Sequence, residues 1–461
     1  MPAASKQSLD KTELFAHMPV RQAVLRQVLP AVASQMITLI YNLADTYFVG
    51  QLNDPYQTAA ITVATAAFVM LTAISNLFGI GGAGAIASSL GKKQSDKARQ
   101  IASLSFWGGL GCAISFSALF ALLARPILHL CGATAETYAY AYGYARWVVI
   151  LGGPFTILNT LLANLVRAEG NASAASFGVS FGGVLNILLD PFFVLPQFLG
   201  MGAVGAGIAT ALSNMAATLF FLGYLLARRN VTVLSLAPGH LRHARAHLKP
   251  ILSVGFPSAM QYALTVAANA ALMKFISGYS AEAVAAVGIV KKLDQLPLFF
   301  SIGVANGLLP LLAFNHAAGD HRRRSQAFRF GTMIALGFSL FCVIVYEIFA
   351  PSLTALFIDD TPTLAYSAVF LRQAVLAMPM VAICYPMIIQ FQAMRQVKEA
   401  MISSLLRKGL LDIPLLFLMD AILPLYGCIW VQPIVDSVSL IAVLIFYARL
   451  QNKQRTARPE A

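Results

Sequence analysis

Charged residues are scarce in this chain of 461 residues, at 11% of the total, whereas 58% of the residues are hydrophobic. Soluble domains carry about a quarter charged residues, so this composition excludes an ordinary soluble protein. The apolar runs are as long as a bilayer crossing, which takes roughly 20 residues of helix. We therefore predict an integral membrane protein that crosses the bilayer many times.

Motifs of soluble enzymes and of disulfide-bonded domains are missing as well. There is no GxxxxGK[ST] sequence, so drive by nucleotide hydrolysis on this chain is not expected. The five cysteines occur without a CxxC pair or a Cys/His cluster, and we interpret them as small packing residues. The first twenty residues are polar, so we expect no cleavable signal peptide. From these absences we predict that the protein is not an enzyme and holds no organic cofactor.

Twelve apolar runs lie between polar breaks, and we predict a membrane-spanning helix for each. The runs of the first half are 24–50, 57–88, 99–124, 138–166, 172–196 and 202–227. Those of the second half are 251–278, 283–315, 326–350, 364–393, 400–422 and 427–449. The predicted fold is all-α, with six-helix lobes at 24–227 and 251–449. A cytoplasmic amino-terminal segment (1–23), a cytoplasmic linker (228–250) and a cytoplasmic tail (450–461) complete the predicted organisation.

Basic residues gather in alternate connections between these runs. Most lie in the segments 92–99, 228–249 and 322–329 and near the two termini, whereas 51–57 contains no Lys or Arg. The positive-inside rule places the even-numbered connections and both termini in the cytoplasm. Because this pattern accounts for the net charge of +13, nucleic acid is not expected as a partner.

The two halves look like copies of one unit. Pro30 in "LPAVASQ" opens the first half, and Pro257 in "FPSAMQY" opens the second. The second run ends in "GIGGAGAIASSLG" (79–91) and the eighth in "GLLPLLAFNHAAG" (307–319), so both contain glycines twelve residues apart. Repeats in one orientation are typical of transporters that alternate access between two lobes. Chance similarity among apolar helices is the alternative, and we interpret GIGGAG itself as a close-packing sequence.

Two carboxylates lie inside predicted spans, Asp45 on the first and Asp190 on the fifth. A charge at the centre of a spanning helix costs about 2.5–3.5 kcal/mol, so such residues usually face a partner or a cavity. At about 1.5 Å per residue, both lie roughly 27–30 Å from the cytoplasmic ends of their helices. Thr210 reaches that level on the sixth span, and Asn186 precedes Asp190 by one turn. We predict that these four residues form a site for Na⁺ or for a shared proton, and no other metal is expected.

A structural role for the same carboxylates stays open at this point. Each aspartate would then cap a local break or pair with a buried base such as Arg146. Pro191 directly follows Asp190, and Pro30 precedes Asp45, so we predict a local bend in both helices.

The second half has no carboxylate at the place of Asp45. Lys291 and Asp294, in "KKLDQLP", stand three residues apart and either neutralise one another or belong to a second polar site. Asp412 and Asp436 lie within the last two runs. The strongest cation or proton site is therefore predicted in the amino-terminal lobe.

Several strings spread over nearly the whole chain resemble the multidrug and toxic compound extrusion (MATE) family. They are "ADTYFVGQL", "LFGIGGAGAIASSLG", "RAEGNASAA", "NILLDPFFV" and "GAVGAGIATALSN". The set of Asp45, Asn186 and Asp190 is similar to the branch called DinF-like. The resemblance implies two six-helix bundles around a central cleft and a multi-pass protein of the bacterial inner membrane, which we expect to be monomeric.

The same resemblance implies a secondary antiporter that exchanges H⁺ or Na⁺ for organic cations and other drugs. Asp45, Asp190, Asn186 and Thr210 would then form the coupling-ion site. The candidate residues of the substrate cavity are Tyr41, Asn159, Asn164, Lys291 and Asp294. The acidic residue that another bacterial branch carries in its tenth helix has no equivalent in "LAMPMVAICYPMIIQ", which argues against coupling in the second lobe.

An alternative within transport is a flippase or exporter of a lipid-linked or oligosaccharide precursor. Such a protein would line its cleft with arginines, and Arg146 is the one arginine that we expect inside the membrane. From another class, a membrane-embedded enzyme would need a His/Glu/Asp cluster, but the seven histidines lie mostly in or near loops.

Overall fold

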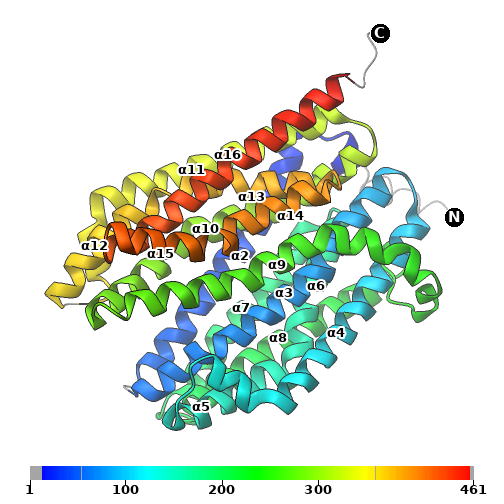
Figure 1. Cartoon of the computed structure of the whole chain (residues 1–461). Helices are drawn as coiled ribbons and strands as arrows, with labels where there is room; N and C mark the ends of the chain where they lie inside the picture. Colours follow the sequence, from blue (N-terminus) through cyan, green and yellow to red (C-terminus); the bar gives the residue numbers. More distant parts are fainter. Residues whose placement is uncertain (1–12, 53, 359, 457–461) are drawn as a thin grey trace.

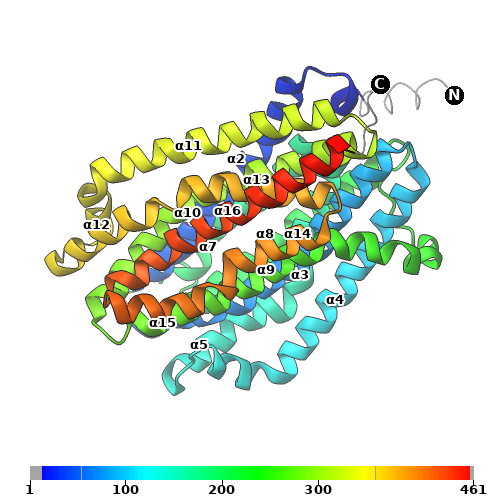
Figure 2. The same cartoon turned by 45° about the horizontal axis from the view of Figure 1, so that its top comes forward.

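The computed structural model describes residues 13–52, 54–358 and 360–456. Over these residues the chain forms helices joined by short connections, and no strand occurs among them. In Figures 1 and 2 the cyan helices lie on one side of the molecule and the yellow-to-red helices on the other. The prediction of an all-α fold is therefore confirmed.

The first half of the chain comprises α2 to α8. Its elements are α2 (Val20–Gly50), α3 (Pro55–Gly91), α4 (Ser95–Leu130), α5 (Ala135–Ala145), the π-helical η1 (Arg146–Leu151), α6 (Gly153–Ala168), α7 (Ala172–Val194) and α8 (Gly202–Ala227). Local chemistry fixes several helix starts. Asp54 caps α3 by accepting hydrogen bonds from the Gln57 side chain and from the backbone of Tyr56 and Gln57, and these bonds lower the pKa of its carboxyl.

The second half comprises η2 to α16. Its elements are η2 (Pro238–His243), α9 (Ala244–Ile276), α10 (Ala281–Ala317), α11 (His321–Ala355), α12 (Thr361–Val375), α13 (Met378–Ala393), α14 (Val397–Leu405), the π-helical η3 (Leu406–Leu410), α15 (Asp412–Ile422) and α16 (Tyr426–Thr456). α9 begins before the predicted run 251–278 and α16 ends after the run 427–449, because polar residues outside the apolar runs continue both helices.

The number of spans is lower than predicted when only long apolar helices are counted. Within the described residues, nine single helices are long and apolar enough to cross a membrane. Two bent pairs, α5–η1 with α6 (51°) and α12 with α13 (42°), raise the number to as many as eleven. The remaining predicted run, 400–422, is divided among α14, η3 and α15 by non-helical backbone at Lys408 and Gly409. Twelve spans therefore stay a prediction.

Three hydrophobic cores show how the two halves meet. One core contains Val28 and Leu165 of the first half together with Leu308 and Phe391 of the second. It lies near the connections 91–95, 168–172, 227–244, 317–321 and 393–397, an end that we call the basic end. The other two cores each belong to one half, and they lie at the opposite end. The halves thus share a core at the basic end and have separate cores at the opposite end.

Glycines bring helices of the two halves into close contact at the basic end. A Cβ at Gly307 of α10 would lie 2.8 Å from the Cα of Val28 on α2, and one at Gly91 of α3 would lie 2.3 Å from the backbone oxygen of Phe314. Within GIGGAG, a Cβ at Gly81 would lie 2.4 Å from the backbone oxygen of Ile251. The interpretation of these glycines as close-packing residues is therefore confirmed.

The segment 13–18 ahead of α2 is also part of this end. Phe15 is buried and stacks on Phe314, with ring centroids 5.2 Å apart. Arg323 of α11 donates hydrogen bonds to the backbone oxygens of Phe15 (2.7 Å), Leu14 (3.3 Å) and Met18 (2.5 Å). The beginning of the first half is thus tied to a helix of the second half.

Candidate functional site

The two predicted carboxylates come from α2 and α7 and lie close enough for their charges to interact. Asp45 and Tyr41 stand one turn apart on α2, as Asn186 and Asp190 do on α7. The Asn186 side-chain nitrogen donates to Asp190 Oδ1 at 3.2 Å and to Thr210 Oγ1 at 3.4 Å. Asp190, Asn186 and Thr210 are all buried, and Asp45 is half-buried. The four residues predicted as one site therefore converge.

Tyr144 of α5 completes this cluster. Its side chain interacts with Asp45 and with Thr210, and both carboxylates act on it electrostatically. Tyr41 also lies within the range of both charges. The site thus draws residues from four helices, α2, α5, α7 and α8.

Three oxygen atoms at this site are buried without a hydrogen-bond partner in the described part of the chain. They are Asp45 Oδ1, Asn186 Oδ1 and Asp190 Oδ2. A buried polar atom without a partner costs roughly 1–3 kcal/mol, and more when it is charged. The cluster therefore favours a species that satisfies oxygen atoms, namely a proton or a hard cation.

No basic side chain neutralises these two carboxylates among the residues that the structure describes. The described ion pairs are Arg372–Glu347 and Arg407–Asp436. Arg146, considered above as a partner of the aspartates, is exposed and takes part in neither pair. The structural alternative, in which a buried arginine neutralises the aspartates, is therefore not supported.

Asn159 is connected to the same cluster, whereas Asn164 is not. Asn159 donates to Asn214 Oδ1 at 3.0 Å, and Asn214 donates to the backbone oxygen of Thr210 at 2.9 Å. Asn164 accepts from Arg167 at 2.9 Å, further along α6 toward the basic end. Of the two asparagines predicted in the cavity, Asn159 extends the polar site, and Asn164 instead orients a buried arginine.

The two prolines lie inside continuous helices. α2 passes through Pro30 and α7 through Pro191 without a non-helical residue. Gly303 of α10 packs against Val32, two residues after Pro30, where a Cβ would lie only 2.7 Å from the Val32 Cα. The predicted bends are therefore not seen in this conformation as breaks of the helix.

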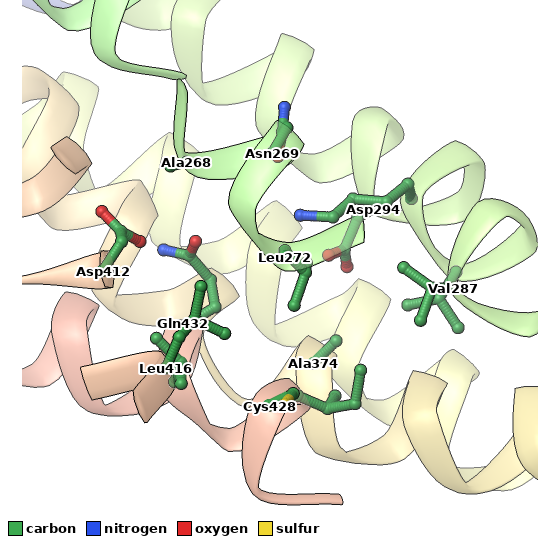
Figure 3. A pocket seen from close by; sticks show the side chains of 14 residues that line it. Ala268, Asn269, Leu272, Val287, Asp294, Ala374, Asp412, Leu416, Cys428 and Gln432 are labelled. Atoms are coloured by element: carbon green, nitrogen blue, oxygen red, sulfur yellow. The ribbon is translucent and has the colours of Figure 1, made fainter. Parts of the chain in front are cut away.

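Lys291 and Asp294 lie apart from this site, in a pocket of the second half. The pocket is bordered by α9, α10, α12, α15 and α16 (Figure 3). The same region contains Arg407, which is buried. The expectation that Arg146 is the one arginine inside the membrane was therefore wrong. Arg407 lies within the predicted run 400–422, where the surrounding apolar residues mask it in an average of hydropathy. Arg407 is neutralised by Asp436, with Nε 3.1 Å from Oδ1.

Sequence reasoning also missed Tyr144 and Asn214. The run "YAYAYGY" offers four tyrosines at 138–144, of which Tyr144 is the buried one. Asn214 could have been predicted, because it is a single amide in a predicted span and an amide inside the membrane needs a hydrogen-bond partner.

The comparison with known proteins points to a family of transporters. The MatE family model matches the chain twice, over residues 30–192 and 257–418. These matches begin at Pro30 and Pro257, the prolines that open the predicted repeat. The "Multidrug export protein MepA" of Staphylococcus saprophyticus is 28% identical over 448 residues, which cover 97% of each chain. The protein of that name from a Staphylococcus aureus strain is 29% identical over 434 residues, covering 94% of this chain and 95% of that protein.

A solved structure has the same fold. It is described as the "Outward-facing conformation of a multidrug resistance MATE family transporter of the MOP superfamily". It superposes with a TM-score of 0.89 at 23% sequence identity, over 96% of this chain and 98% of that one. The two matches of the family model together span more than half of the sequence. The chain therefore belongs to the MatE family and is a multi-pass membrane protein.

Proposed function

We propose that this protein is a multidrug efflux antiporter that exchanges H⁺ or Na⁺ for organic cations and other drugs. Its full-length relatives are named multidrug export proteins. The observation that carries the proposal is the Asp45–Asp190 cluster, where three buried oxygen atoms have no hydrogen-bond partner among the described residues. Substrates are small molecules, and we expect a monomer without an organic cofactor.

Coupling follows from the charge of this site. An external ion neutralises Asp45 and Asp190 while the halves are apart at the end opposite the basic end, and the substrate leaves. The ion-loaded protein then closes at that end and opens at the basic end, where the ion is released and a drug is loaded. Because ion and drug stabilise different states, a gradient of one drives transport of the other. We propose that α2 bends near Pro30 during this change.

We further propose twelve spans, with lobes at 24–227 and 251–449 and both termini in the cytoplasm. In Figure 1 the start of α2 and the end of α16 lie toward the same end of the molecule, which requires an even number of crossings. Eleven candidates by length and composition then leave α14–η3–α15 as the last crossing. The basic connections gather at that same end, and the positive-inside rule makes it cytoplasmic. The bacterial inner membrane is the expected location, in agreement with the bacterial relatives.

Transport by purified protein in lipid vesicles tests this proposal. A fluorescent organic cation is loaded, and its export is followed under an imposed pH gradient or an imposed sodium gradient. We expect one of the two gradients to drive export by the wild type, and Asp45→Asn to abolish the response because it removes the titratable, cation-binding group. Asp96→Asn, at an exposed position on α4, is the matched control and should respond like the wild type.

The outcomes separate the candidate functions. Full gradient-driven export by Asp45→Asn would remove the coupling site from this proposal. A wild-type protein that responds to neither gradient would point to the flippase or exporter of a lipid-linked precursor.

A further inference from the structure

The second half contains a charged pocket that the coupling mechanism does not use. We propose that this pocket binds the carboxylate of zwitterionic substrates at Lys291 and their cationic group at Asp294. The inference rests on the proposed export function and adds a substrate class to it.

The pocket lies between five helices. Its lining includes Asn269 of α9, Lys291 and Asp294 of α10, Asp412 of α15 and Gln432 of α16. Apolar side chains of the same helices complete the wall, among them Leu272, Val287 and Leu416. Figure 3 shows the carboxylate of Asp294 pointing into the space beside Leu272, with Gln432 and Asp412 across from it. Apolar walls with a few convergent polar groups are the usual lining of a small-molecule site, but such sites hold roughly 300–1,000 Å³. The cavity has a volume of about 40 Å³ in this conformation, so a dye-sized ligand requires the second half to open around it.

Most of the charges around this pocket are held in a fixed network. Arg407 donates to Asp436 Oδ1 at 3.1 Å, and Gln432 donates to Asp436 Oδ2 at 2.6 Å. Lys408 in turn donates to Gln432 Oε1 at 2.6 Å. The backbone N–H of Gly409 donates to Asp412 Oδ2 at 2.6 Å. Apart from Arg407 Nη1, which has no hydrogen-bond partner among the described residues, these groups are held by one another or by the backbone. We therefore interpret them as a wall of the pocket and not as its binding groups.

The break in the helix explains why this network exists. Gly409 has φ +103°, and Lys408 also departs from helical geometry. A Cβ at Gly409 would lie 2.8 Å from Leu264 Cδ2 on α9, so the turn packs tightly against the neighbouring helix. Irregular backbone at membrane depth is tolerated only where it is buried or lines a cavity. Discontinuous helices of this kind are typical of binding sites in transporters.

Lys291 and Asp294 are different, because neither side chain has a fixed partner. Among the described residues, they form no hydrogen bond and no ion pair within 4.0 Å, with each other or with the network. Asp294 Oδ1 is buried and unpartnered. The two charges nevertheless act on one another and on the aspartates around the pocket. The Lys291 ammonium and the Asp294 carboxylate are thus available at the pocket for hydrogen bonds with a ligand.

This arrangement selects a different ligand from the site in the first half. There, two carboxylates face each other with no basic partner, which suits a cation. Here a lysine and an aspartate stand three residues apart on one helix face, which suits a ligand with charges of both signs. A permanent monocation would satisfy Asp294 but would meet the Lys291 ammonium, whereas a zwitterion satisfies both. A charged hydrogen bond is worth roughly 1.5–3 kcal/mol, or about tenfold or more in affinity.

A matched pair of dyes tests the inference. One is a rhodamine with a free carboxylate, which is a zwitterion, and the other is its methyl ester, which is a monocation of nearly the same shape. Export of both is measured in the vesicles described above. We expect Lys291→Met to slow export of the carboxylate dye about tenfold and to leave export of the ester at the wild-type rate or above it, because the ammonium that repels a monocation is gone. Lys291→Arg keeps the cation and should retain most of the wild-type rate for the carboxylate dye.

Lys292 offers the control on the same helix. It lies next to Lys291 in sequence but does not line the pocket, and its ammonium faces the ring of Phe357 at 5.9 Å. Lys292→Met should leave export of both dyes unchanged. Fluorescence-polarisation binding of the carboxylate dye to the purified protein provides a second measurement, because it does not depend on gradient-driven turnover.

The possible results distinguish this inference from the export function itself. If Lys291→Met changes export of neither dye, or slows both equally, the zwitterion site is overturned while export stands. If the wild type exports only the ester, the zwitterion site is likewise overturned. If the wild type exports neither dye under either gradient, the export function has failed and takes this inference with it.

Discussion

At the scale of single residues, the position of a carboxylate along its helix carried most of the information. The rise per residue places Asp45 and Asp190 at one level, and the structure brings them together with Asn186 and Thr210. The contribution of Tyr144 could not be predicted from the sequence. Four tyrosines alternate in "YAYAYGY", and only the packing of α5 decides which of them is buried. Charge inside an apolar run is readable from sequence, whereas the choice among equivalent neutral groups is not.

Tyr144 provides a direct test of the coupling site. Tyr144→Phe removes the hydroxyl that interacts with Asp45 and Thr210 and keeps the ring. We expect about a tenfold higher concentration of the coupling ion for half-maximal export, in line with the loss of one hydrogen bond to a charged group. The measurement is the ion dependence of dye export in vesicles. Tyr142→Phe, whose ring stacks on Tyr138 instead, should keep the wild-type dependence, and an unchanged dependence in Tyr144→Phe would exclude a role for that hydroxyl.

At the scale of elements, apolar runs predicted straight helices well and broken ones poorly. The predicted run 202–227 coincides with α8, and 172–196 differs from α7 by two residues. The run 138–166 is instead bent by the π-helical turn at Arg146–Leu151, and 400–422 is interrupted at Gly409. A glycine or a widened turn changes the direction of the backbone without changing hydropathy. The charged residues Lys291, Asp294 and Asp412 of the second polar region were therefore predictable, whereas the broken helix that brings Asp412 to the pocket was not.

The packing of α10 against α2 is the helix–helix contact whose contribution to stability can be tested most simply. A Cβ at Gly307 would lie 2.8 Å from the Cα of Val28 and 2.9 Å from the backbone oxygen of Gln27, so Gly307→Ala forces the two helices apart. Overpacking of this kind costs roughly 1–3 kcal/mol. We expect a lower melting temperature for the purified protein. Gly288→Ala, on the same helix with nothing within 4 Å of a Cβ, should melt at the wild-type temperature or slightly above it. Equal melting temperatures for both variants would mean that this contact is looser than the structure indicates.

At the scale of the whole molecule, the distribution of cores defines the conformation. One core joins the halves at the basic end, and the two other cores stay within their own halves at the opposite end. The repeat predicted from sequence accounts for the way the halves meet, because α2 packs on α10 and α3 on α9, which are equivalent pairs in the two units. The conformational state itself could not be predicted, since the proposed alternating access requires the same sequence to form a second state that is open at the basic end.

The segment 13–18 holds the basic end closed in this conformation, and its removal should shift the balance between the states. Arg323 of the second half donates to three backbone oxygens of this segment, which continues into α2 only two residues after Met18. Opening the basic end must break these bonds or detach the segment from α2. Each bond to a charged donor contributes roughly 1.5–3 kcal/mol, and about 1.4 kcal/mol changes a population ratio tenfold.

Arg323→Ala is therefore expected to populate the state that is open at the basic end. Spin labels at Gln94 and Lys398, exposed on either half at this end, report the separation in a background without the native cysteines. We expect a second, longer distance to gain population in Arg323→Ala, whereas Arg322→Ala, at an exposed neighbouring position, should give the wild-type distribution. If the distributions of all three proteins coincide, the bonds of Arg323 serve only to order the segment. The closed end would then depend on the shared core and its glycine contacts, and Gly307→Ala would become the variant expected to open it.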